Sequence, residues 1–78
     1  MKYNKHKINA SSDNIIKAID MYIVGYKAIR NKEILKDHFV LGMTFEEVAE
    51  KHDMSTRHIK KIIYDNESII IDHLRVEN

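Results

Sequence analysis

A capping box near the middle of the chain is the sequence feature that most constrains its fold. The Thr44 hydroxyl is placed to accept a hydrogen bond from the amide of Glu47, and the Glu47 carboxylate can reach back to the amide of Thr44. The inward residues that follow recur at the spacing of one helix face, at Phe45, Val48, Ala49 and His52. The pattern predicts a helix of about two turns that begins directly after Thr44.

A second helix is predicted directly after this one. His52, Asp53 and Met54 break the apolar pattern, and Ser55 belongs to the residue types that cap helix starts through a side-chain oxygen. Aspartate tolerates the left-handed conformation of a tight turn better than most residues do, whereas His52 needs a hydrogen-bond partner or a place near the surface. The inward positions of the second helix are Ile59, Ile62 and Ile63.

The two helices have the spacing of a helix-turn-helix over residues 45–64. Ala49 falls where such helices cross and only a small side chain fits, and Val48 and Met54 fill the space beneath the turn. In this motif the second helix lies in the major groove of DNA, with its first residues at the base edges. The cap and the outward residues of that helix form the candidate DNA-binding set: Ser55, Thr56, Arg57, His58, Lys60, Lys61 and Tyr64.

The distribution of charge supports the same face. Residues 54–64 contain three bases and no acid, although the net charge of the whole chain is only +1. Cations suit phosphate neutralisation, and Arg57 is able to make a bidentate contact with guanine. Residues 1–10 form a second basic island, expected to be a flexible arm that follows phosphates or enters the minor groove through Lys2, Lys5 and Lys7. A purely solubilising tail is the alternative for this arm.

The segment before the motif is also predicted to be helical, because the chain contains no Pro and only two Gly. A first helix is expected over 13–29, and three adjacent residues are candidates for its N-cap: Ser11, Ser12 and Asp13. Gly25 weakens the end of this helix. Asn31 is expected to cap a second helix that ends at Gly42, where a left-handed residue is tolerated.

After the motif, residues 69–74 are predicted to be helical rather than a strand, following an interruption at 66–68. The fold class is therefore all-α, a small helix-turn-helix bundle of four to five helices. We expect one helix-turn-helix domain over 11–75 and a tail at 76–78. No apolar run approaches the ~18 residues of a membrane span, no signal peptide is visible, and the absence of Cys fits a reducing compartment. A cytoplasmic protein without membrane contact is expected.

Residues 31–65 carry a resemblance to a known family. A helix is followed by a Gly-Xaa-Thr turn at 42–44, a short helix with Glu46 and Glu47 that ends near Ala49, and a Ser-capped helix from Ser55. This segment resembles the fourth region of sigma factors and is similar to the small sigma-like regulators of phages and sporulating bacteria. The resemblance covers 35 of the 78 residues and implies promoter or operator binding through Ser55, Thr56, Arg57, Lys60 and Lys61.

Two positions depart from that family, and two other uses of the motif stay open. The family usually places Leu at position 52 and Gly at position 53, where this chain has His52 and Asp53. Neither change removes a residue of the predicted DNA face. The same motif also serves in adaptors that bind RNA polymerase, a sigma factor or another regulator, and in the DNA-recognition subunits of phage packaging complexes.

Oligomeric state and chemistry complete the expectations. A homodimer is favoured, because two half-sites bring specific affinity into range. Four C-terminal residues either meet a second subunit or pack back on the first helix: Ile69, Ile70, Ile71 and Leu74. The histidines include no pair four residues apart on one helix, so no metal site is predicted at His6, His38, His52, His58 and His73. No nucleophile–base pair or phosphate loop is visible, so neither enzyme activity nor a cofactor is expected.

Overall fold

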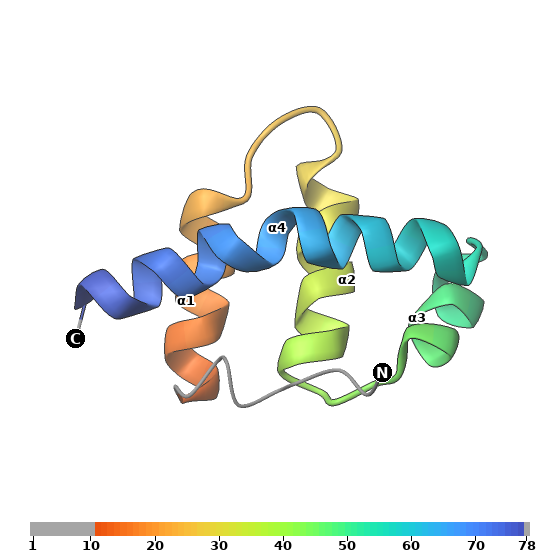
Figure 1. The fold of residues 1–78 in the computed structure, drawn as a ribbon, viewed down its shortest axis with the longest axis horizontal. Coiled ribbons are helices and arrows are strands. Elements are labelled where there is room, and N and C mark those ends of the chain that lie inside the picture. The colour runs from red at the N-terminus through yellow and green to blue at the C-terminus, as the bar shows by residue number, and fades with distance from the viewer. Residues whose placement is uncertain (1–10, 78) are drawn as a thin grey trace.

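Four helices form a bundle in the computed structural model, which describes residues 11–77 (Figure 1). In chain order they are α1 (Ser12–Tyr22), α2 (Ala28–Phe39), α3 (Phe45–His52) and α4 (Thr56–Glu77). α4 crosses α1 and α2, and α3 packs beneath the N-terminal end of α4 (Figure 1). This confirms the all-α class. The predicted arm at 1–10 lies outside the described residues, and α4 continues through two of the three residues of the predicted tail.

α1 is shorter than predicted. Ser11 is its N-cap, with Oγ accepting a hydrogen bond from the Asn14 amide at 3.3 Å. The helix ends at Tyr22 instead of continuing to residue 29, because Gly25 adopts a φ of 108° that no helix accommodates. Tyr26, which the predicted helix over 13–29 contained, consequently lies outside α1 and is 95% exposed.

α2 begins earlier than the sequence indicated. Its N-cap is Lys27, which makes no side-chain capping bond, and the predicted cap Asn31 lies inside the helix. There the Asn31 Oδ1 atom accepts two hydrogen bonds from the guanidinium of Arg30, at 3.2 and 3.1 Å. The predicted end holds: after Phe39 the chain reverses at Gly42, whose φ is 74°, and the Met43 amide donates to the Asp37 carbonyl at 3.0 Å.

The turn between α3 and α4 forms as predicted. The capping box is present, with Thr44 N to Glu47 Oε1 at 2.8 Å and Glu47 N to Thr44 Oγ1 at 3.1 Å. Asp53 closes α3 in the left-handed conformation, with φ 56° and ψ 49°. Ser55 Oγ then accepts from the His58 amide at 3.1 Å, which caps α4.

α4 is one continuous helix of 22 residues, so the predicted interruption at 66–68 is wrong. Asn66 stays within the helix by donating from its side-chain amide to the Ile62 carbonyl at 2.7 Å. The C-terminal half packs back on α1: Ile70 and Leu74 are buried, and the rings of Tyr22 and His73 stack with centroids 3.5 Å apart. Of the two roles predicted for this segment, the structure shows the intramolecular one for Ile70 and Leu74.

The core runs through all four helices. Its fully buried side chains are Ile19, Ile34, Leu35, Val48, Ile59, Ile63 and Ile70. Val24 and Ile29, beside the α1–α2 connection, are by contrast 79% and 88% exposed. Within the described range, no helix combines the length and apolar character that a membrane crossing needs.

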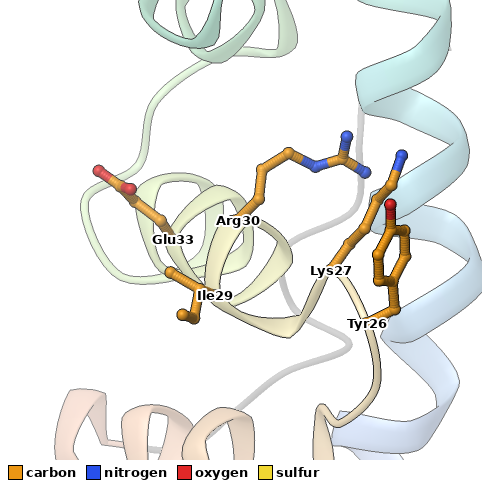
Figure 2. Close-up of a pocket in the computed structure, with 5 residues that line it drawn as sticks. All are labelled: Tyr26, Lys27, Ile29, Arg30 and Glu33. Carbon is orange, nitrogen blue, oxygen red and sulfur yellow. The ribbon is translucent and has the colours of Figure 1, made fainter.

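A surface hollow of about 580 Å³ adjoins this connection, at the start of α2. Tyr26, Lys27 and Arg30 lie on one side of the helix start, and Ile29 and Glu33 lie on the other (Figure 2). The Lys27 ammonium stands 5.7 Å from the centroid of the Tyr26 ring. The hollow thus combines exposed apolar side chains with charges of both signs.

Candidate nucleic-acid interface

The inner side of the α3–α4 pair is closed by small and β-branched residues. Val48 is fully buried and Ala49 is 5% exposed, in one core cluster with Ile59 and Ile63. Met54 packs against the same cluster from the turn. These placements confirm the inward positions that the sequence predicts for the motif. They fix which side of α4 is left for solvent.

The outward side of α4 carries most of the candidate DNA-binding set. Five of those residues on the helix are exposed: Arg57, His58, Lys60, Lys61 and Tyr64. Ser55 is also exposed, but its hydroxyl oxygen already caps the helix, and Thr56 is half-buried. The three arm lysines lie outside the described residues: Lys2, Lys5 and Lys7. The structure therefore brings five candidate side chains to one exposed stretch of helix.

The cations of this face differ in their surroundings. Lys61 Nζ lies 2.9 Å from Asp65 Oδ2, and both side chains are well exposed. Such a pair four residues apart on a helix contributes only about 0.2–0.5 kcal/mol, so a phosphate competes with it easily. Among the carboxylates whose side chains the structure describes, in residues 11–74, none forms an ion pair with Arg57.

Lys60 faces an aromatic ring instead of a carboxylate. Its Nζ stands 5.6 Å from the centroid of Phe45, the first residue of α3. The Phe45 ring stacks on His38 of α2, with centroids 4.8 Å apart and planes at 16°, and meets Tyr64 edge-on at 5.8 Å. The sequence analysis assigned Phe45 only to the inner face of its helix. The sequence signal for this contact is the four-residue spacing of Lys60 and Tyr64, which places both side chains on the same side of α4.

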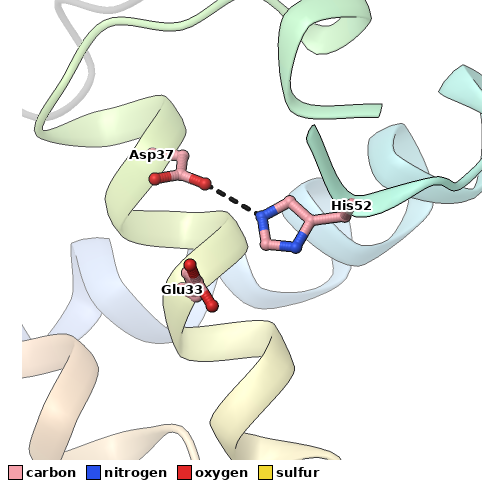
Figure 3. Close-up of side chains that lie close together, drawn as sticks. All are labelled: Glu33, Asp37 and His52. Atoms are coloured by element: carbon pink, nitrogen blue, oxygen red, sulfur yellow. Dashed lines mark hydrogen bonds and ion pairs between the residues drawn. The ribbon is translucent and has the colours of Figure 1, made fainter. Parts of the chain in front are cut away.

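A network of polar side chains joins α2 to the end of α3, and Figure 3 shows its contact between Asp37 and His52. The Asp37 side chain is 4% exposed; its Oδ1 accepts from Lys51 Nζ at 3.0 Å, and its Oδ2 lies 2.9 Å from His52 Nε2. The hydrogen bond to Asp37 raises the pKa of Lys51 above its ordinary value. His52 thereby has the partner that the sequence predicts it to need. These contacts attach α2 to the C-terminal end of α3.

His38 is a buried histidine close to this network. Its ring is 4% exposed, and Nδ1 lies 2.8 Å from the Met43 carbonyl oxygen, a geometry in which the ring N–H donates. The ring also meets Phe39 edge-on, with centroids 5.0 Å apart. His38 therefore connects the loop after α2 to the aromatic ring at the start of α3.

One group of side chains has ligand atoms close enough for a metal ion. Glu33, Asp37 and His52 bring one such atom each within 4.8 Å of the others (Figure 3). The sequence argument missed this group because it considered pairs on a single helix, and here two helices contribute. The Lys51 ammonium already contacts Asp37 and lies 3.7 Å from Glu33. Its positive charge opposes a second cation at the same oxygens.

The chain matches no family model, no curated protein and no solved structure. The geometry of the α3–α4 pair and the residues that this pair exposes are therefore the basis for inferring a function.

Proposed function

We propose that this protein is a sequence-specific, duplex-DNA-binding transcriptional regulator that inserts the N-terminal half of α4 into the major groove. One observation carries the proposal. The buried faces of α3 and α4 leave a single outward side of α4, and the residues exposed there between the Ser55 cap and Tyr64 include Arg57, Lys60 and Lys61 and no carboxylate.

The chemistry of that side suits nucleic acid. Lysine and arginine neutralise phosphates and release counterions, which supplies most of the affinity for any duplex. Arginine near the start of a recognition helix reads guanine through its O6 and N7 atoms. Arg57 is the second residue of α4 and is exposed, so it occupies the position from which such a contact is made. Regulation then follows from occupancy, because a bound protein blocks or assists polymerase at a promoter.

Homodimer formation is part of the proposal, since two half-sites raise affinity and specificity together. The C-terminal residues Ile70 and Leu74 are covered by the protein's own α1, so a second subunit has to use other surfaces. Light scattering of the purified protein measures the mass directly, with and without DNA. On the resemblance to sigma-like regulators, we place the protein in the cytoplasm of a bacterium, as a bacterial or phage product.

A protein-binding adaptor is the second candidate, with RNA polymerase or a sigma factor as its partner. The observation that favours it is the exposed corner at the α1–α2 connection, where Val24, Tyr26 and Ile29 are each exposed beside the hollow at the start of α2. Exposed apolar side chains among charged ones are found in protein-contact surfaces. This corner is separate in sequence from the basic side of α4.

The decisive experiment is a gel-shift with a pool of random-sequence duplex DNA, followed by selection and sequencing of the bound fraction. The proposal predicts a shift at low salt and enrichment of one sequence over successive rounds. A protein that remains folded and shifts no duplex even at low salt argues for the adaptor. Binding without enrichment retains DNA binding and removes sequence specificity.

A further inference from the structure

We infer that Phe45 is a positioning residue, which holds Lys60 against the DNA backbone so that Lys60 supplies affinity and not base recognition. The inference rests on the proposed function. Phe45 opens α3, whereas Lys60 is the fifth residue of α4. Their side chains meet across the motif, with the Lys60 ammonium 5.6 Å from the ring centroid. At that separation the face of the ring attracts the cation.

The ring that faces Lys60 is itself held from two sides. His38 of α2 stacks on it at 4.8 Å and 16°, and Tyr64 of α4 meets it edge-on at 5.8 Å and 71°. Phe45 is half-buried and packs against the core. Three helices therefore determine the orientation of this ring. Because Lys60 is held beside a fixed ring, its side chain loses less conformational entropy when it binds DNA.

The position of the Phe45 ring indicates which part of the DNA Lys60 contacts. In a helix-turn-helix the first helix crosses the phosphate backbone, while the first residues of the second helix approach the base edges. Phe45 stands at the start of the first helix and draws Lys60 toward it, away from the groove floor that Arg57 approaches one turn earlier. The ammonium has three donors, so hydrogens not directed at the ring remain for phosphate oxygens. Contacts to phosphate set register and carry no sequence information.

A double-mutant cycle on DNA binding tests this inference. Wild type, Phe45→Leu, Lys60→Ala and the double variant are titrated with random-sequence duplex DNA and with the selected site. Phe45→Leu is expected to weaken binding about two- to fivefold on both DNAs alike. In the Lys60→Ala background the same substitution causes no measurable further loss. Phe45→Tyr keeps the ring and is expected to bind as wild type does.

The cycle separates positioning from a merely structural role. Equal losses from Phe45→Leu with and without Lys60 overturn the inference while leaving DNA binding in place. If Phe45→Leu weakens binding to the selected site but not to random-sequence duplex, the inference is also overturned, because Lys60 would then be a base-reading residue. If wild type binds no duplex at all, the proposed function fails and this inference fails with it.

A measurement on the wild-type protein covers the case in which Phe45→Leu does not fold. The ε-methylene protons of Lys60 are expected to show an upfield ring-current shift in proton NMR, relative to those of the exposed Lys17 on α1. Identical shifts for the two lysines would show that no ring holds Lys60 in solution and would overturn the inference.

Discussion

His52 Nε2 lies 2.9 Å from Asp37 Oδ2, so the last residue of α3 is tied to a buried carboxylate on α2. The Lys51 ammonium contacts the other oxygen of that carboxylate at 3.0 Å. Because the Asp37 side chain is only 4% exposed, its charge depends on these two donors for stabilisation. The motif is therefore attached to the rest of the bundle by polar contacts as well as by apolar packing.

Asp37→Asn is expected to destabilise the fold by about 1–3 kcal/mol, because the amide carries no charge to face the Lys51 ammonium and offers one acceptor oxygen instead of two. Urea unfolding followed by circular dichroism measures the change in the free energy of unfolding. Asp72→Asn is the matched control, since Asp72 is exposed on α4. Equal urea midpoints for the two variants would contradict a stabilising role for the network.

The Asp20–Lys36 pair gives a pH dependence of known sign. Lys36 Nζ lies 2.9 Å from Asp20 Oδ1, and this hydrogen bond lowers the pKa of Asp20 below its ordinary value of 3.8. A depressed carboxyl pKa stabilises the folded state above pH 3.8, and this stabilisation is lost as pH falls through the folded-state pKa. Asp20 is exposed and Lys36 is partly exposed, so solvent screens the pair and its effect on stability is small.

Thermal melts between neutral pH and pH 3 test this sign. The difference in melting temperature between wild type and Asp20→Asn is expected to shrink as pH falls below 4. A difference that stays constant over this range would show that the pair does not contribute in solution.

Ala49→Leu is expected to destabilise the protein by about 1–3 kcal/mol, because it overpacks the crossing of α3 and α4. Ala49 is 5% exposed among fully buried neighbours, so added methyl groups have no free space. Glu50→Leu places the same side chain at the next, exposed position and serves as the control. If Ala49→Leu unfolds at the wild-type midpoint, the helix crossing is not where the structure places it.

Salt dependence distinguishes phosphate contacts from other binding. If the cations of α4 meet phosphates, the logarithm of the affinity falls with the logarithm of salt concentration, by about 0.9 per neutralised phosphate. Lys61→Ala is expected to reduce that slope by roughly one unit or less. Lys17→Ala, a change to an exposed lysine on α1, leaves it unchanged. Affinity that is insensitive to salt favours the adaptor.

Arg57→Ala is expected to cost about 1–3 kcal/mol on the selected site and to relax preference at one or two base pairs, because a bidentate guanine contact is lost. The melting temperature should not change, since Arg57 is exposed and forms no ion pair with a described carboxylate. Selection repeated with the variant measures the relaxed positions. Unchanged affinity of a folded Arg57→Ala protein for the selected site would show that Arg57 does not read bases.

Local signals predicted the motif well, because its helix ends depend on residues within three or four positions of each other. The Thr44–Glu47 box, the left-handed Asp53 and the Ser55 cap all follow from such contacts. Asn31 misled the same reasoning: a capping side chain is optional, and the N-cap of α2 is Lys27, four residues earlier, where the chain emerges from the Gly25 turn. The burial of Ile34 and Leu35 outweighs a local preference at Asn31.

Contacts between helices were beyond local signals. The sequence requires a partner for His52 without identifying Asp37, which lies 15 residues away on another helix. It likewise places Lys60 on the outward face without showing that the Phe45 ring lies beneath it. Polar residues at 66–68 suggested a break, but Asn66 bonds to its own helix, and Glu67 and Ser68 are half-buried and exposed, positions at which a helix accepts polar side chains.

The unbroken α4 holds two groups of buried residues on one face of a single helix. Ile59 and Ile63 face the core near α3, and Ile70 and Leu74 face it near α1, on the same rod. One residue inserted between Asn66 and Ser68 would rotate everything downstream by about 100° and turn Ile70 and Leu74 out of the core. Seven inserted residues, close to two full turns, would restore the phase and lengthen the rod by about 10 Å. The burial of Ile70 and Leu74 against α1 therefore depends on both the rotational phase and the length of α4.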